Sequence, residues 1–103
     1  MTAEDFKRLV LAMPGATESA HKGHPDFRGG DRIFATLGYP DSRWAMVKLL
    51  PEQRSSVTSA EPDVFSPVKG GWGKRGSTLL RLELADEKTA DNAIRMAWTN
   101  LHP

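Results

Sequence analysis

Residues 27–37 read Phe-Arg-Gly-Gly-Asp-Arg-Ile-Phe-Ala-Thr-Leu, and this stretch decides the fold class. Two glycines followed by an aspartate favour a tight turn, and β-branched and aromatic side chains favour strands on both sides of it. The pattern predicts a β-hairpin that turns at residues 29–31. Because tight turns join antiparallel neighbours, the sheet that contains this hairpin is predicted to be antiparallel.

Further strands are predicted on both sides of the hairpin. Residues 17–28 are short and are interrupted by Gly23 and Pro25, which predicts one or two brief strands. Residues 38–42 (Gly-Tyr-Pro-Asp-Ser) predict a second turn, and residues 43–49 alternate in the manner of a strand. A later strand is predicted over residues 78–84.

Three helices are predicted around these strands. Thr2 and Asp5 are spaced as a capping box, and apolar residues 6, 9, 10 and 13 then recur at helical spacing. Pro51 begins a short serine-rich helix that extends to about Ser59. Asp86 caps a final helix whose apolar residues 90, 93, 94, 97, 98 and 101 share one face.

These elements predict an α+β fold. We expect an antiparallel sheet of about five strands, with the N- and C-terminal helices packed on one face. A chain of 103 residues has room for one core, so a single domain over residues 1–103 is expected.

Composition excludes several classes of site. The chain has no cysteine, which excludes disulfides, thiolate nucleophiles and cysteine-ligated metals. The formal net charge is +1, so any electrostatic function must depend on where the charges lie. The first residues are acidic and no apolar segment is long enough to span a bilayer. We therefore expect a cytoplasmic, monomeric protein that does not enter membranes.

Positive charge is concentrated in residues 67–76, Pro-Val-Lys-Gly-Gly-Trp-Gly-Lys-Arg-Gly, and no acid occurs between residues 64 and 82. Lys69, Lys74 and Arg75 in such a glycine-rich loop suit contacts with phosphates. Trp72 has two interpretations, stacking on an exposed base or packing against the end of the sheet, and packing is the commoner role of tryptophan. Arg28 and Arg32 flank the predicted hairpin turn, where they could extend the cationic surface or protect the hairpin from aggregation.

Several segments resemble the MmcQ/YjbR family of small bacterial proteins. They are residues 23–28 (Gly-His-Pro-Asp-Phe-Arg), 32–35 (Arg-Ile-Phe-Ala), 48–52 (Lys-Leu-Leu-Pro-Glu), 72–76 (Trp-Gly-Lys-Arg-Gly) and 97–98 (Ala-Trp). Each segment is short, but together they follow the family's order over nearly the whole chain.

The resemblance implies a CyaY-like fold and a double-wing DNA-binding protein. On this hypothesis Lys69, Lys74, Arg75, Arg28 and Arg32 contact DNA phosphates, and binding is weak and sensitive to salt. The alternative hypothesis is a non-catalytic module for an anionic small molecule or a protein partner. In that case His24, Arg28, Trp72 and Lys74 line a cleft.

No pattern in the sequence nominates a catalytic residue, a cofactor or a metal site. His21 and His24 are three residues apart, so on a strand they point to opposite faces, and no further ligand is suitably spaced. The serines and threonine of residues 55–59 have no histidine in an evident relationship, and glycine fingerprints for nucleotides are missing from the sequence. An enzyme is therefore not predicted.

Overall fold

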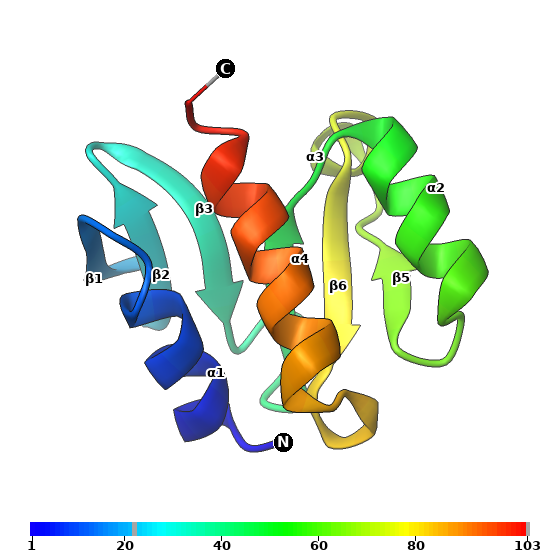
Figure 1. Cartoon of the computed structure of the whole chain (residues 1–103), viewed down its shortest axis with the longest axis horizontal. Coiled ribbons are helices and arrows are strands. Elements are labelled where there is room, and N and C mark those ends of the chain that lie inside the picture. The colour runs from blue at the N-terminus through cyan, green and yellow to red at the C-terminus, as the bar shows by residue number, and fades with distance from the viewer. Residues whose placement is uncertain (22, 103) are drawn as a thin grey trace.

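The structure is a computed structural model that describes residues 1–21 and 23–102, apart from the side chains of His21 and Trp72. Helices α1, α2 and α4 lie over one face of a sheet (Figure 1). In chain order the elements are α1 (Ala3–Leu11), β1 (Ala16–His21), β2 (His24–Gly29), β3 (Arg32–Leu37), β4 (Trp44–Lys48), α2 (Pro51–Ala60), β5 (Phe65–Pro67), α3 (Gly71–Lys74), β6 (Ser77–Arg81), the 3₁₀ helix η1 (Leu82–Leu84) and α4 (Glu87–Thr99).

The sheet has six strands in the order β1-β2-β3-β4-β6-β5, and every neighbouring pair is antiparallel. Strands β1 to β4 follow one another through short turns, as the hairpin pattern predicts. The predicted α+β class, with the N- and C-terminal helices on one face, is confirmed. The sixth strand is β5, a three-residue edge strand that ends in Pro67 and carries too little pattern to be predicted.

The two terminal helices begin at the predicted caps. Thr2 Oγ1 accepts a hydrogen bond from the backbone N–H of Asp5 at 3.1 Å, and Asp5 Oδ2 accepts one from Thr2 N–H at 3.0 Å. Asp86 Oδ1 accepts from Thr89 N–H at 2.8 Å at the start of α4. These side chains satisfy N–H groups that have no partner within the helix.

The last strand is shorter than the sequence predicts. β6 ends at Arg81, so the prediction of a strand over residues 78–84 is wrong beyond that point. Leu82 N–H donates to Arg43 C=O at 3.0 Å, and Ala85 N–H then donates to Leu82 C=O at 3.3 Å, which turns the chain into η1. The apolar residues Leu82 and Leu84 continue the alternating pattern of a strand, but the side chain of Leu84 is 50% exposed.

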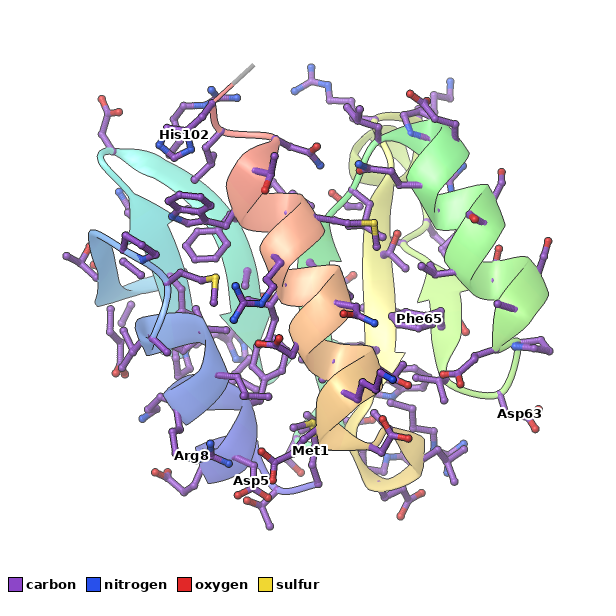
Figure 2. All side chains as sticks on the ribbon, in the orientation of Figure 1. Met1, Asp5, Arg8, Asp63, Phe65 and His102 are labelled. Atoms are coloured by element: carbon purple, nitrogen blue, oxygen red, sulfur yellow. The ribbon has the colours of Figure 1, made fainter. Side chains whose placement is uncertain are left out.

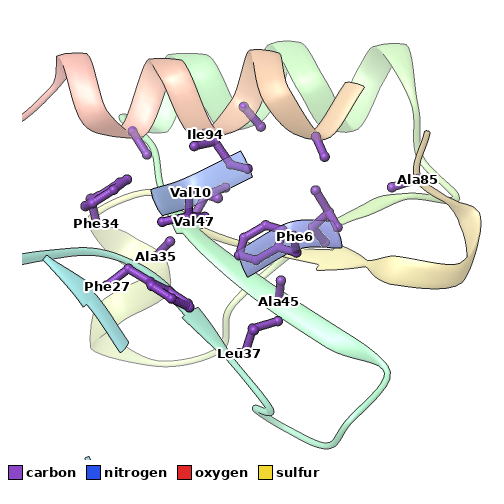
Figure 3. Packing of buried hydrophobic residues seen from close by; sticks show 14 of the residues in the cluster. Phe6, Val10, Phe27, Phe34, Ala35, Leu37, Ala45, Val47, Ala85 and Ile94 are labelled. Carbon is purple, nitrogen blue, oxygen red and sulfur yellow. The ribbon is translucent and has the colours of Figure 1, made fainter. Parts of the chain in front are cut away.

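The core lies between the sheet and helices α1 and α4 (Figure 3). Phe6 from α1 meets Phe27 from β2 edge to face, with ring centroids 6.5 Å apart. Val47 and Ile94 are also fully buried in this cluster and connect β4 with α4. Burial of these aromatic and aliphatic side chains supplies the main driving force for folding.

Two glycines set the path of the chain between α3 and β6. A Cβ on Gly73 would overlap the carbonyl of Val68, and a Cβ on Gly76 would overlap the carbonyl of Leu49. Gly76 also has φ of +102°, which a side chain rarely permits. The backbone at Gly73 therefore lies close against Val68, which follows β5, and the backbone at Gly76 lies close against Leu49 at the end of β4. Arg75, between these two contacts, is held at that end of the sheet.

Candidate anion-binding site

A pocket of about 330 Å³ lies where the C-terminal end of α4 meets the ends of the central strands. This is the end of the sheet at which β3 begins, β4 finishes and β6 begins (Figure 1). The lining residues come from four elements and their flanking turns: Arg32, Lys48, Leu49, Leu50, Arg75, Ser77, Ala97, Asn100 and Leu101.

Among the described residues that line the pocket, three are cations and none is an acid. Arg32 is the first residue of β3 and Lys48 is the last residue of β4, so the antiparallel pairing of these strands places both at one end. Ser77 pairs with Lys48 across β4 and β6, and Arg75 precedes Ser77 by two residues. Sheet topology thus gathers three positive charges that lie far apart in the sequence.

Lys48 is partly buried beside the two arginines of the pocket. Burial lowers the pKa of the Lys48 ammonium below its usual value, and the positive charges of Arg32 and Arg75 lower it further. An anion bound between Arg32 and Arg75 would lower the electrostatic repulsion at this end of the sheet. The pocket is therefore electrostatically suited to a negative ligand.

A pair of amide side chains holds the wall of the pocket. Asn100, the C-cap of α4, donates from Nδ2 to Gln53 Oε1 at 2.8 Å and to the Lys48 carbonyl at 3.2 Å. Gln53 Oε1 also accepts from the backbone N–H of Leu50 at 2.8 Å. These hydrogen bonds connect the end of α4 to the junction between β4 and α2. They therefore fix the positions of two sides of the pocket relative to each other.

Helix α3 is fixed beside the pocket by α2. Arg54 Nη1 donates a hydrogen bond to the carbonyl of Gly73, and the N–H of Lys74 donates to the carbonyl of Gly70 at 3.2 Å. Four residues with two glycines have little tendency to form a helix alone. The sequence accordingly predicted a loop here, and tertiary contacts convert it into a turn of helix.

Five of the eight arginines are paired with carboxylates. Arg8 binds Glu87 at 2.8 Å and lies near Asp5 on α1 (Figure 2). The same kind of pairing holds for four others: Arg28 with Asp26, Arg43 with Asp41, Arg81 with Glu83, and Arg95 with Asp91.

The remaining three arginines are Arg32, Arg54 and Arg75, and they lie at the pocket end. In the described part of the chain none of the three forms an ion pair with a carboxylate. Two acids, Asp31 and Glu52, also belong to this end, but neither lines the pocket. The uncompensated positive charge is therefore local.

The predicted DNA-contacting residues divide into three groups. Arg32 and Arg75 line the pocket, whereas Lys69 and Lys74 are exposed on either side of α3. Arg28 binds Asp26 through two hydrogen bonds of 3.1 and 3.3 Å, and Asp26 is 1% exposed. That ion pair already compensates the charge of Arg28, so Arg28 is poorly placed to serve a ligand.

Two residues of the cleft expected around His24 and Trp72 lie far apart: His24 and Lys74 are at opposite ends of the sheet. His24 begins β2 and lies beside the turn at Gly38, where its Nδ1 would be 3.1 Å from a Cβ on that glycine. This is the opposite end of β2 and β3 from Arg32 and α3, so His24 and Lys74 do not share a cavity. The backbone of Trp72 belongs to α3, and its side chain lies outside the described residues.

Lys48 and Asn100 were not identified as site residues from the sequence. Lys48 belongs to the alternation of a strand and to the segment 48–52 that resembles the family, and Asn100 is not one of the apolar residues of the last helix. Hairpin geometry offered one available signal, since the first residue of a strand and the last residue of its antiparallel neighbour share an end. Asn100 had no such signal, because its role depends on how α4 packs.

Two further features of the described residues bear on the type of site. Among them, no group of three or more histidine, aspartate or glutamate side chains is arranged to hold a metal ion. None of the helices in residues 1–21 and 23–102 has the length and apolar character needed to cross a membrane.

Comparison with known proteins gives a family and a fold. The YjbR family model matches residues 11–100. The crystal structure of Deinococcus radiodurans protein DR2400, described as a family-model domain DUF419, is similar with a TM-score of 0.81 and 16% sequence identity. That match covers 97% of this chain and 78% of the other. No curated protein matches the chain.

Proposed function

The chain belongs to the YjbR family, and on that premise we propose that it binds DNA through phosphates of the backbone. The contacts come from Lys69, Lys74 and Arg75 around α3, with Arg32 on the neighbouring strand end. Support for this proposal comes from the local excess of positive charge and from the sequence resemblance. Arg28 is left out because Asp26 already neutralises it.

The observation that carries the proposal is the extension of positive charge beyond the pocket. Lys69 and Lys74 are exposed, do not line the pocket and form no ion pair with a carboxylate of the described chain. A ligand with a single charge would reach only part of this surface. A polymer with regularly spaced phosphates would contact the lysines and the pocket rim together.

Four phosphate contacts predict weak binding without strong sequence preference. Non-specific binding of this kind has a Kd of about 10⁻⁴–10⁻⁶ M at physiological salt. The logarithm of the binding constant should fall with the logarithm of the salt concentration, with a slope of about −3 to −4 for four contacts. No side chain in the proposed set is assigned to reading bases.

The proposal is tested by fluorescence anisotropy with a short labelled duplex whose 5′ ends are hydroxyls. Binding should weaken steeply between about 50 and 200 mM salt. The substitutions Lys69→Ala and Lys74→Ala should each reduce the salt slope by about one. Lys88→Ala is the matched control, because Lys88 is an exposed lysine at the start of α4, away from the pocket end.

Two results would contradict DNA binding by this mechanism. One is an affinity that stays constant over the salt range, which would show that counterion release is not involved. The other is an equal effect of Lys88→Ala and Lys74→Ala, which would show that only total charge matters.

A further inference from the structure

The volume and the apolar lining of the pocket are not explained by contact with an internal phosphate of DNA. Its volume of about 330 Å³ falls in the range of small-molecule sites, and part of its lining is apolar, from Leu49, Leu50, Ala97 and Leu101. An internal phosphodiester continues in two directions along a strand. A pocket between a helix end and strand ends is better matched to a group at the terminus of a ligand.

The donors in the pocket suit phosphate more than carboxylate. Arg75 makes no hydrogen bond to a described residue, and Arg32 makes one long bond, from Nη1 to the Leu101 carbonyl at 3.4 Å. Guanidinium groups offer paired N–H donors in a planar fork that fits phosphate oxygens. Two such forks can therefore be directed at one ligand group.

The charge of the pocket indicates a dianion. A phosphate monoester carries about −1.5 to −2 charges at pH 7, whereas a phosphodiester or a carboxylate carries about −1. Arg32 and Arg75 together present two positive charges, and no described carboxylate lines the pocket. The more highly charged anion gains more from this arrangement.

We infer that the pocket binds the terminal phosphate of a phosphate monoester, held by the guanidinium groups of Arg32 and Arg75. The apolar side of the pocket accepts the adjoining part of the ligand. The phosphate belongs either to the 5′ end of a nucleic-acid strand or to a small phosphorylated molecule. This inference is independent of the proposed contact with internal DNA phosphates.

The test uses isotope-labelled full-length chain and matched ligand pairs, followed by amide chemical shifts. The pairs are adenosine 5′-monophosphate with adenosine, and a thymidine tetranucleotide with and without a 5′-phosphate. Ribose 5-phosphate is added as a small monoester without a base. The phosphate-bearing member of each bound pair should shift the amides of Arg75, Ser77 and Leu101, with an affinity at least about tenfold higher than its partner.

Variants then connect the preference to the pocket. Arg32→Gln and Arg75→Gln should each weaken monoester binding by about fivefold or more, because each removes a charge-assisted pair of hydrogen bonds. Lys88→Gln is the control for net charge, and thermal unfolding of every variant verifies that it is folded. Equal binding of ligands with and without phosphate would overturn the inference, as would unchanged monoester binding by both folded arginine variants.

The results with the different ligands also distinguish this inference from the proposed function. Binding of the 5′-hydroxyl duplex without a preference for monoesters would overturn the pocket inference alone. Binding of monoesters without binding of the duplex would overturn the DNA proposal alone. A tighter complex with the phosphorylated tetranucleotide than with ribose 5-phosphate would identify a strand end as the source, and the reverse order would identify a small molecule.

Discussion

The side-chain amides of Asn100 and Gln53 hydrogen-bond to each other, and each amide both donates and accepts. Asn100 Nδ2 donates to Gln53 Oε1 at 2.8 Å, and Gln53 Nε2 donates to Asn100 Oδ1 at 3.3 Å. The two residues are 47 positions apart and join the end of α4 to the first turn of α2. They also satisfy backbone groups of Lys48 and Leu50 beside the pocket.

We expect Asn100→Ala to lower the free energy of unfolding by about 1–2 kcal/mol, because it leaves partners of several partly buried hydrogen bonds unsatisfied. Gln53→Ala should have a similar effect, and the double variant should lose less than the sum. Urea denaturation measures all three. Asn92→Ala is the control on the exposed face of the same helix. Strictly additive effects would contradict the coupling.

The ion pair between Arg28 and Asp26 predicts a large effect on stability. Asp26 is 1% exposed, so Arg28→Gln would leave a buried carboxylate without its cation and should lower the free energy of unfolding more than the loss of an exposed ion pair does. Adding Asp26→Asn to Arg28→Gln should recover part of that loss, as measured by urea denaturation. The folded Arg28→Gln protein should retain the salt slope of DNA binding. A slope reduced as much as in Lys74→Ala would return Arg28 to the DNA-binding surface.

Gly76 and Gly70 offer a comparison between steric overlap and backbone strain. Both have positive φ, but only at Gly76 would a Cβ overlap a neighbouring atom, the carbonyl of Leu49. Gly76→Ala should cost more than about 3 kcal/mol, since strain and overlap combine. Gly70→Ala should cost about 1–2 kcal/mol from strain alone. Thermal and urea unfolding provide the measurement, and equal losses would contradict the close approach of Gly76 to Leu49.

The ion pair of Asp41 with Arg43 predicts how the free energy of unfolding changes at acid pH. Hydrogen bonds from Arg43 lower the pKa of Asp41 from 3.8 to about 2. Because the folded state binds this proton less readily than the unfolded state, the pair stabilises the protein above about pH 4 and loses its effect as the pH falls toward about 2. In the Asp41→Asn variant, the free energy of unfolding should fall less steeply as the pH decreases from about 4 to about 2.

The control for this pH series is Asp63→Asn, at an exposed position with no ion pair in the described structure (Figure 2). Denaturant unfolding at a series of acid pH values gives the comparison. An acid limb of the same steepness in the Asp41→Asn variant and the unmodified protein would contradict the assignment.

Local signals in the sequence predicted the elements that depend on neighbouring residues. The capping pair Thr2 and Asp5, the Pro51 start of α2 and the Asp86 cap are short-range devices, and each lies where the pattern indicated. The hairpin at residues 29–31 was also predicted, because its turn residues and the adjacent apolar runs are contiguous. The antiparallel order of the first four strands then follows from short turns.

The pocket could be predicted only in part. Arg32 and Arg75 were selected for their charge, but their meeting with Lys48 depends on strand pairing across β3, β4 and β6. Helix α3 was missed because its glycines disfavour helix and only Arg54 and its neighbours stabilise it. The end of β6 at Arg81 was not predicted, because Leu82 and Leu84 continue the apolar alternation of a strand although they belong to η1.

The separation of paired from unpaired arginines gives this nearly neutral molecule a directional electric field. With a net charge of +1, it experiences little overall pull toward a polyanion at long range. The field of its pocket end can nevertheless rotate the molecule during an encounter, so that this end approaches first. Mutation of Arg32, Arg54 or Arg75 to a neutral residue would therefore alter the orientation of the encounter as well as the net charge of the molecule.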